Sequence, residues 1–159
     1  MPKFKFKSSG VNVDNVELKT IVESRPIGVA TPLSLGSGRS GLFEMNFDPV
    51  EQISDNLRNL ILTNAGERLG NYYYGANLKP ITTEYSSMED FENAAMTRIL
   101  NAVNQFLPIV DLDSFSVSRV QEDDGNADRG LLRIDMTVKY NIPQLRIGGK
   151  VLNVSMYVI

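Results

Sequence analysis

The sequence contains no cysteine and no histidine. Without cysteine there is no disulfide framework, no thiolate nucleophile and no thiolate metal site. Without histidine there is neither a Ser-His-Asp triad nor a His-ligated zinc site. Any catalysis would have to use carboxylates, lysine, tyrosine or a hard metal bound by oxygen. These absences favour a protein that is not an enzyme.

The sequence also lacks long apolar runs and an excess of basic residues. No apolar run approaches the roughly 20 residues that a membrane helix needs. The net charge of -3 and the pI near 5.0 predict no basic surface for nucleic acid or an anionic membrane. The N-terminus, MPKFKFKSSG, is basic but has no apolar secretory core. We expect a chain that stays in the cytoplasm where it is made, without a nucleic-acid or membrane partner.

What is present fits one globular domain with a real core. The chain has 159 residues, 42% hydrophobic and 22% charged. Residues 1–47 are predicted to form an extended N-terminal arm followed by a loop rich in Pro, Gly and Ser. Residues 48–159 are predicted to form a single domain.

The first predicted helix begins at Asp48. Asp48 can act as N-cap, and Pro49 suits the first helical position. The apolar residues recur at helical spacing and form one stripe: Val50, Ile53, Leu57, Leu60 and Ile61. Asp55 and Arg58 are predicted to lie on the opposite, solvated face. Gly66 is predicted to stop the helix, because glycine takes a left-handed backbone without a Cβ clash.

A second helix is predicted to begin at Ser86 or Ser87 and to end at Leu107, before Pro108. Its outward charges, Arg98 among them, are expected to be solvated. From Ile109 the period changes to that of strands. The clearest strand alternates apolar residues from Leu132 to Tyr140, and Gly148-Gly149 is predicted to make a hairpin turn before a last strand over 151–159. This order predicts an α+β fold, with two helices packed on one face of a small antiparallel sheet.

Two motifs resemble ligand sites but lack the context that their chemistry needs. GSGRSG, residues 36–41, matches the dinucleotide fingerprint, yet a strand-like segment follows it instead of a helix N-terminus. Asp124, Asn126 and Asp128 resemble the start of a calcium loop, but Arg129 occupies the position that requires glycine. We therefore interpret both segments as loops and expect no metal site.

The corner after the first helix carries a recognisable pattern. LILTNAGERL, residues 60–69, precedes an aromatic run, Gly75 and Leu78. This pattern resembles the sheath-initiator (baseplate-wedge) family of contractile phage tails, a lysozyme-like family also found in type VI secretion systems. The likeness extends from about Pro26 to Tyr140. One departure is clear: the family usually carries Glu-Pro-Arg after its second helix, whereas this chain has Leu107-Pro108-Ile109.

Two surfaces are predicted to contact other proteins. Tyrosine and arginine are enriched at interfaces, and the first surface is the corner formed by Glu67, Arg68, Tyr72, Tyr73 and Tyr74. The second is the last strand, whose outward face carries Val151, Asn153, Ser155, Tyr157 and Ile159. That strand ends without the lysine, proline or bulge that discourages pairing at a sheet edge. Sheath subunits in the resembling family exchange terminal strands, which implies a docking role for such an edge.

The resemblance implies a structural subunit of the tail baseplate, seated in the wedge near the tail tube, on which the first ring of sheath assembles. The implied partners are the sheath protein, baseplate wedge subunits, and tail tube or tube-baseplate proteins, with no cofactor and no small-molecule substrate. The implied location is the virion, after assembly in the host cytoplasm. Two alternatives are the equivalent subunit of a bacterial injection system, and a carboxylate-dependent glycoside hydrolase using acids such as Glu67, Glu84 or Asp90.

Overall fold

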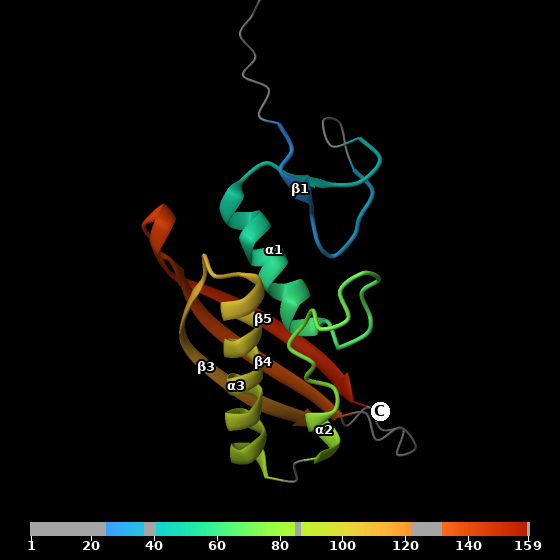
Figure 1. Cartoon of the computed structure of the whole chain (residues 1–159), viewed down its shortest axis with the longest axis vertical. Coiled ribbons are helices and arrows are strands. Elements are labelled where there is room, and N and C mark those ends of the chain that lie inside the picture. The colour runs from blue at the N-terminus through green and yellow to red at the C-terminus, as the bar shows by residue number, and fades with distance from the viewer. Residues whose placement is uncertain (1–24, 37–40, 85–86, 122–131, 159) are drawn as a thin grey trace, which may run out of the picture.

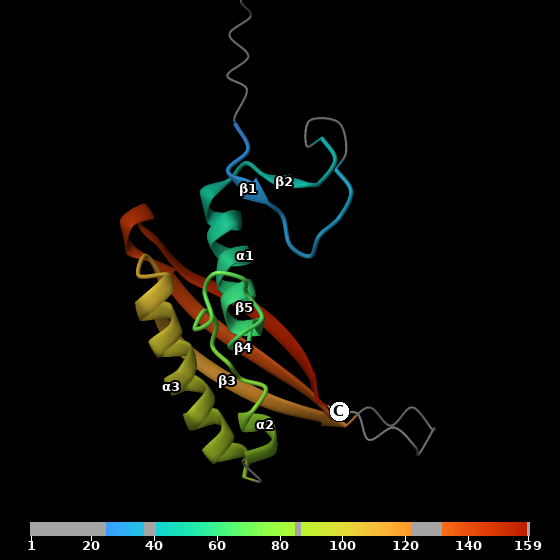
Figure 2. The same cartoon turned by 45° about the vertical axis from the view of Figure 1, so that its right-hand side comes forward.

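The computed structural model describes residues 25–36, 41–84, 87–121 and 132–158. The predicted arm up to residue 24, the loop around Asp124 and Asp128, and Ile159 lie outside this range. The described chain has three α-helices and two small antiparallel sheets, which confirms the α+β prediction. The helices are α1 (Pro49–Leu62), α2 (Ile81–Glu84) and α3 (Met88–Phe106). Figures 1 and 2 show α1 and α3 side by side on one face of the larger sheet.

The larger sheet has three strands in the order β3-β4-β5. These are β3 (Asp111–Gln121), β4 (Leu132–Ile142) and β5 (Ile147–Val158). Both pairings are antiparallel. In this order β4 is the central strand, and β3 and β5 are the edge strands in the described chain. Helix α3 contacts β3, and α1 contacts β5.

The core lies between this sheet and the two long helices. β4 alternates as predicted: Ile134, Met136, Val138 and Tyr140 are each at most 1% exposed, on the face that the helices cover. The buried positions of α1 include Leu57, Leu60 and Ile61, and those of α3 include Phe91, Ile99 and Val103. The Tyr140 hydroxyl forms a hydrogen bond with the Ser54 hydroxyl on α1, so the only polar atom of the buried tyrosine side chain has a partner.

The N-cap prediction for α1 is confirmed, but the predicted stop at Gly66 is wrong. Asp48 Oδ1 accepts the Val50 N–H at 3.0 Å, whereas the helix ends at Leu62 with Thr63 as C-cap. The last carbonyls are satisfied from farther along the chain: Leu60 O accepts the Ala76 N–H at 2.9 Å, and Thr63 O accepts the Asn77 N–H at 3.2 Å. Residues 63–77 therefore form a compact loop with neighbouring ends.

Asp55 is not on a solvated face, contrary to the prediction. Before α1, two short strands, β1 (Gly28–Val29) and β2 (Met45–Asn46), pair antiparallel beside the N-terminal half of the helix (Figure 2). Asp55 is 9% exposed, and its Oδ2 accepts the Thr31 N–H at 2.9 Å and the Asn46 amide at 2.8 Å. The segment before α1 thus covers this part of the helix and supplies two donors to the buried carboxylate, and Arg58 on α1 donates to its other oxygen at 3.4 Å.

Two further predictions need correction. Gly148 and Gly149 belong to β5, and the turn before it is the 3-10 helix η2 (Pro143–Leu145), followed by Arg146 with φ of 54°. Proline fixes the φ of the first residue of that turn, so no glycine pair is required there. Arg98 is not simply solvated, because it donates to the Asn77 carbonyl and lies 3.8 Å from a Glu84 carboxylate oxygen.

Candidate protein interface

Glu67 is held by the turn that it occupies. Its two carboxylate oxygens accept the Asn64 backbone N–H at 2.8 Å and the Asn64 amide at 3.0 Å. Gly66 donates its N–H to the Tyr72 carbonyl at 2.8 Å with φ of +86°, a conformation that favours glycine. The direction of Glu67 is therefore fixed by backbone geometry, as the corner prediction requires.

These hydrogen bonds lower the pKa of Glu67 from its ordinary value of 4.5, the Asn64 backbone N–H having the largest effect. A carboxyl whose folded pKa is depressed stabilises the fold above its unfolded pKa, and this stability is lost as the pH falls through the folded pKa. We expect Glu67→Gln to melt slightly below the parent chain at about pH 7 and together with it at an acidic pH below the folded pKa of Glu67. The effect is small because the side chain is exposed and solvent screens it. Melting curves at both pH values test this, and a difference that does not change with pH would contradict it.

Arg68 does not pair with Glu67. Its guanidinium lies 3.9 Å from the centre of the Tyr74 ring, and that ring lies 5.1 Å from the Phe106 ring on α3. Tyr74 thus packs against the core and supports Arg68 through a cation–π contact. Tyr72 and Tyr73 are 63% and 77% exposed and meet edge to face, so the three tyrosines have different roles.

Leu69 is a candidate interface residue that the sequence prediction omitted. Its side chain is fully exposed next to Arg68, at the outer end of the same loop. The only sequence signal was an apolar residue between the charged pair and Gly70, within an otherwise polar turn. Together with Tyr72 and Tyr73 it gives the corner an apolar, solvent-facing surface.

The last strand lies at an edge of the sheet, with β4 as its sheet neighbour in the described chain. Val151, Asn153, Ser155 and Tyr157 all lie on its exposed face, and Val151 and Tyr157 are more than half exposed. Lys150 and a register shift between Tyr140 and Ile142 lie at the beginning of β5, before the stretch for which the free edge is predicted. The stretch from Val151 onward carries neither device.

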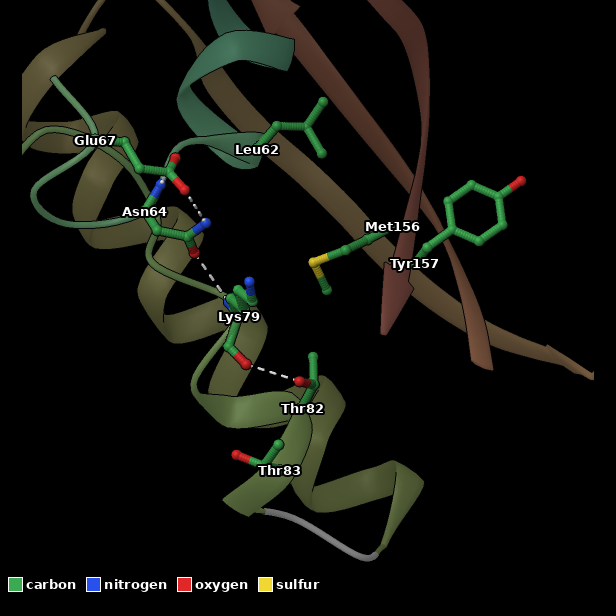
Figure 3. A pocket seen from close by; sticks show the side chains of 8 residues that line it. All are labelled: Leu62, Asn64, Glu67, Lys79, Thr82, Thr83, Met156 and Tyr157. Carbon is green, nitrogen blue, oxygen red and sulfur yellow. Dashed lines mark hydrogen bonds between the residues drawn. The ribbon is translucent and has the colours of Figure 1, made fainter. Parts of the chain in front are cut away.

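The structure brings Glu67 and Tyr157 to the same place, although they are 90 positions apart in the sequence. Both line a pocket of about 310 Å³ beside the end of β5 (Figure 3). The other lining residues are Leu62, Asn64, Lys79, Thr82, Thr83 and Met156. Arg68 and the three tyrosines do not line it. The two predicted surfaces therefore meet at one pocket, while the aromatic part of the corner lies outside it.

The carboxylates offered for hydrolysis do not behave as a glycosidase pair. The pKa of Glu67 is lowered by its hydrogen bonds to Asn64, whereas a general acid needs a raised pKa. Glu84 forms an ion pair with Arg98 at 3.8 Å and does not line the pocket that Glu67 lines. In the described ranges, no group of three or more acidic residues could hold a metal ion, and no helix is long and apolar enough to cross a membrane.

The departure from the family pattern at residues 107–109 has a structural basis. Leu107 is the C-cap of α3, and both Leu107 and Ile109 are partly buried against the core. At the two positions where the resembling family carries charged residues, this chain has Leu107 and Ile109, which pack against the core.

Among solved structures, the chain is similar to a chain of the anti-feeding prophage baseplate, with a TM-score of 0.54 and 19% identity, covering 72% of this chain and 82% of that one. It is also similar to a Geobacter sulfurreducens protein provisionally described as a tail lysozyme (TM-score 0.46, 16% identity, 70% and 90% coverage). A third is a chain of the type VI secretion system baseplate complex (TM-score 0.43, 14% identity, 69% and 93% coverage). No family model and no curated protein matches the sequence. The first likeness shows a common fold.

Proposed function

We propose that this chain is a structural, non-enzymatic subunit of the baseplate of a contractile phage tail, or of a related bacterial injection machine. In this role it sits in the wedge near the tail tube and provides the seat for the first ring of sheath. Its partners are the sheath protein, other wedge subunits, and tail tube or tube-baseplate proteins. It functions in the virion, after assembly in the host cytoplasm.

The observation that carries this proposal is the edge position of β5 in the described part of the chain, in a fold shared with a chain of the anti-feeding prophage baseplate. Every second residue of an antiparallel edge strand directs its N–H and C=O away from its only neighbour. A strand added by another chain satisfies these groups, and this is a common mode of protein recognition. The motif from Leu60 to Leu69 supports the same assignment independently.

A proline in this edge is expected to prevent sheath assembly. Ser155→Pro removes a backbone donor and disfavours further pairing along the edge. Baseplates should still form, but tails should lack sheath in electron micrographs. Deletion of residues 157–159 should have the same result, because it shortens the edge.

Three controls separate docking from folding. Ser155→Ala removes the hydroxyl that bonds to Asp135 but keeps the backbone N–H, so its tails should be sheathed. Ser116→Pro places the same change on β3, at the opposite edge, and should also permit sheath formation. Melting curves on the isolated chains identify any variant that fails to fold. Sheathed tails of normal length from folded Ser155→Pro protein would overturn the proposed docking edge.

A further inference from the structure

The pocket shared by Glu67 and Tyr157 lies on the free side of β5. Its walls come from the end of α1, the turn at Asn64, helix α2 and the end of β5. No lining residue belongs to β3 or β4. Figure 3 shows the Met156 thioether directed into the space between β5 and Lys79, whereas the Tyr157 ring points away. The pocket therefore extends the sheet edge sideways, on the face that carries the helices.

Four of the six polar side chains in the wall, those of Asn64, Glu67, Thr82 and Thr83, are hydrogen-bonded within the chain. The side-chain amide nitrogen of Asn64 donates to Glu67, and the side-chain oxygen of Asn64, Oδ1, accepts the Lys79 backbone N–H at 3.1 Å. The hydroxyls of Thr82 and Thr83 donate to the Lys79 and Pro80 carbonyls at 2.7 and 2.9 Å. A polar guest would find few free partners there and would lose its hydration.

The apolar part of the wall is open to solvent. Leu62 is 40% exposed at the end of α1, and Met156 is partly buried on the opposite side. The charges of Glu67 and Lys79 lie on exposed residues and attract each other. An apolar guest would cover Leu62 and Met156 while leaving both charges hydrated.

The position of Met156 identifies where such a guest would come from. Directly opposed side chains on neighbouring strands lie roughly 5 Å apart on the same face of the sheet. A strand added to the free edge of β5 would thus place one side chain next to Met156, on its pocket side. Backbone pairing and pocket occupancy are geometrically linked.

We propose that this pocket receives one large apolar side chain from an extended segment that a partner chain adds to the free edge of β5. The inference rests on the docking edge of the proposed function and adds its specificity determinant. The backbone groups of β5 provide the affinity for any strand, and the pocket selects those with leucine or phenylalanine in the register opposite Met156. Neighbouring positions on that strand can vary more freely.

The test uses ten-residue peptides of alternating threonine and valine, with alanine, leucine, phenylalanine or aspartate at one central valine position. The chain carries ¹³C-methyl methionine, and the Met156 signal is assigned from its loss in Met156→Leu. Leucine and phenylalanine guests should bind about tenfold or more tightly than alanine and shift the Met156 methyl signal. The aspartate guest should bind no better than alanine.

A matched pair of variants locates the preference. Thr83→Phe fills the pocket from α2, and it should abolish the leucine preference while leaving alanine-guest affinity unchanged. Thr97→Phe is the control, since Thr97 is also an exposed helical threonine bonded to a backbone carbonyl, but on α3. It should keep the preference. If Thr83→Phe does not fold, Leu62→Ser replaces it in the test, because it makes the pocket wall polar without filling the pocket.

The outcomes distinguish this inference from the proposed function. If all guests bind equally and Ser155→Pro abolishes binding, the edge docks strands but the pocket selects nothing, and the inference is overturned alone. A leucine preference that survives Thr83→Phe and Leu62→Ser also overturns it. If no peptide binds at all, both the docking edge and the pocket assignment are wrong.

Discussion

Replacing Leu57 with alanine is expected to lower the free energy of unfolding by about 2–5 kcal/mol. Leu57 is 0% exposed and lies in the core cluster formed by the long helices and the sheet. The substitution removes buried apolar surface and leaves a cavity that the surrounding side chains fill only partly. Denaturant melts of the isolated chain measure the change.

Leu100→Ala is the matched control for this prediction. Leu100 is on α3 and 40% exposed, so the same loss of atoms should cost under about 1 kcal/mol. Equal losses for the two variants would mean that the stripe of α1 does not face the core.

The second large effect is expected for Gly75→Ala, at roughly 2–6 kcal/mol. Gly75 has φ of +115°, which L-residues rarely adopt, and a Cβ there would collide with the Thr63 carbonyl. That carbonyl accepts the Asn77 N–H, so the loop could not close on the end of α1 as it does now. The cost therefore combines backbone strain with a displaced hydrogen bond.

Gly70→Ala separates these two contributions. Gly70 also has a positive φ, of +84°, but a Cβ there would meet nothing within 4 Å. It should cost only about 1–2 kcal/mol, the strain alone. If thermal melts show equal costs for Gly70→Ala and Gly75→Ala, the close packing of the loop against Thr63 is not a source of stability.

The sequence predicted those parts of the fold that depend on local periodicity. The α1 stripe at Leu57 and Leu60, and the alternation from Ile134 to Tyr140, could be recognised because burial repeats with the period of the element. The edge position of the last strand was predicted from its two partly apolar faces and from the absence of a lysine, proline or bulge near its end. These features need no knowledge of distant contacts.

Three of the features that were missed depend on residues far apart in the chain. Asp55 looked solvated because two of its donors, Thr31 and Asn46, come from the segment that precedes α1. The end of α1 was misplaced because amides at Ala76 and Asn77 satisfy its last carbonyls, which makes a glycine stop unnecessary. The pocket could not be predicted, since it forms only when the corner and the end of β5 come together.

The central claim, that β5 offers a free edge which a partner strand covers, is tested most directly by residue-resolved hydrogen exchange. The measurement compares the amides of residues 151–158 in the isolated chain and in assembled tails. We predict that every second amide exchanges rapidly in the isolated chain and becomes strongly protected in the tail, while the alternate amides, bonded to β4, are protected in both. Outward-facing amides that exchange equally in both samples, or that are already protected in the isolated chain, would contradict the claim.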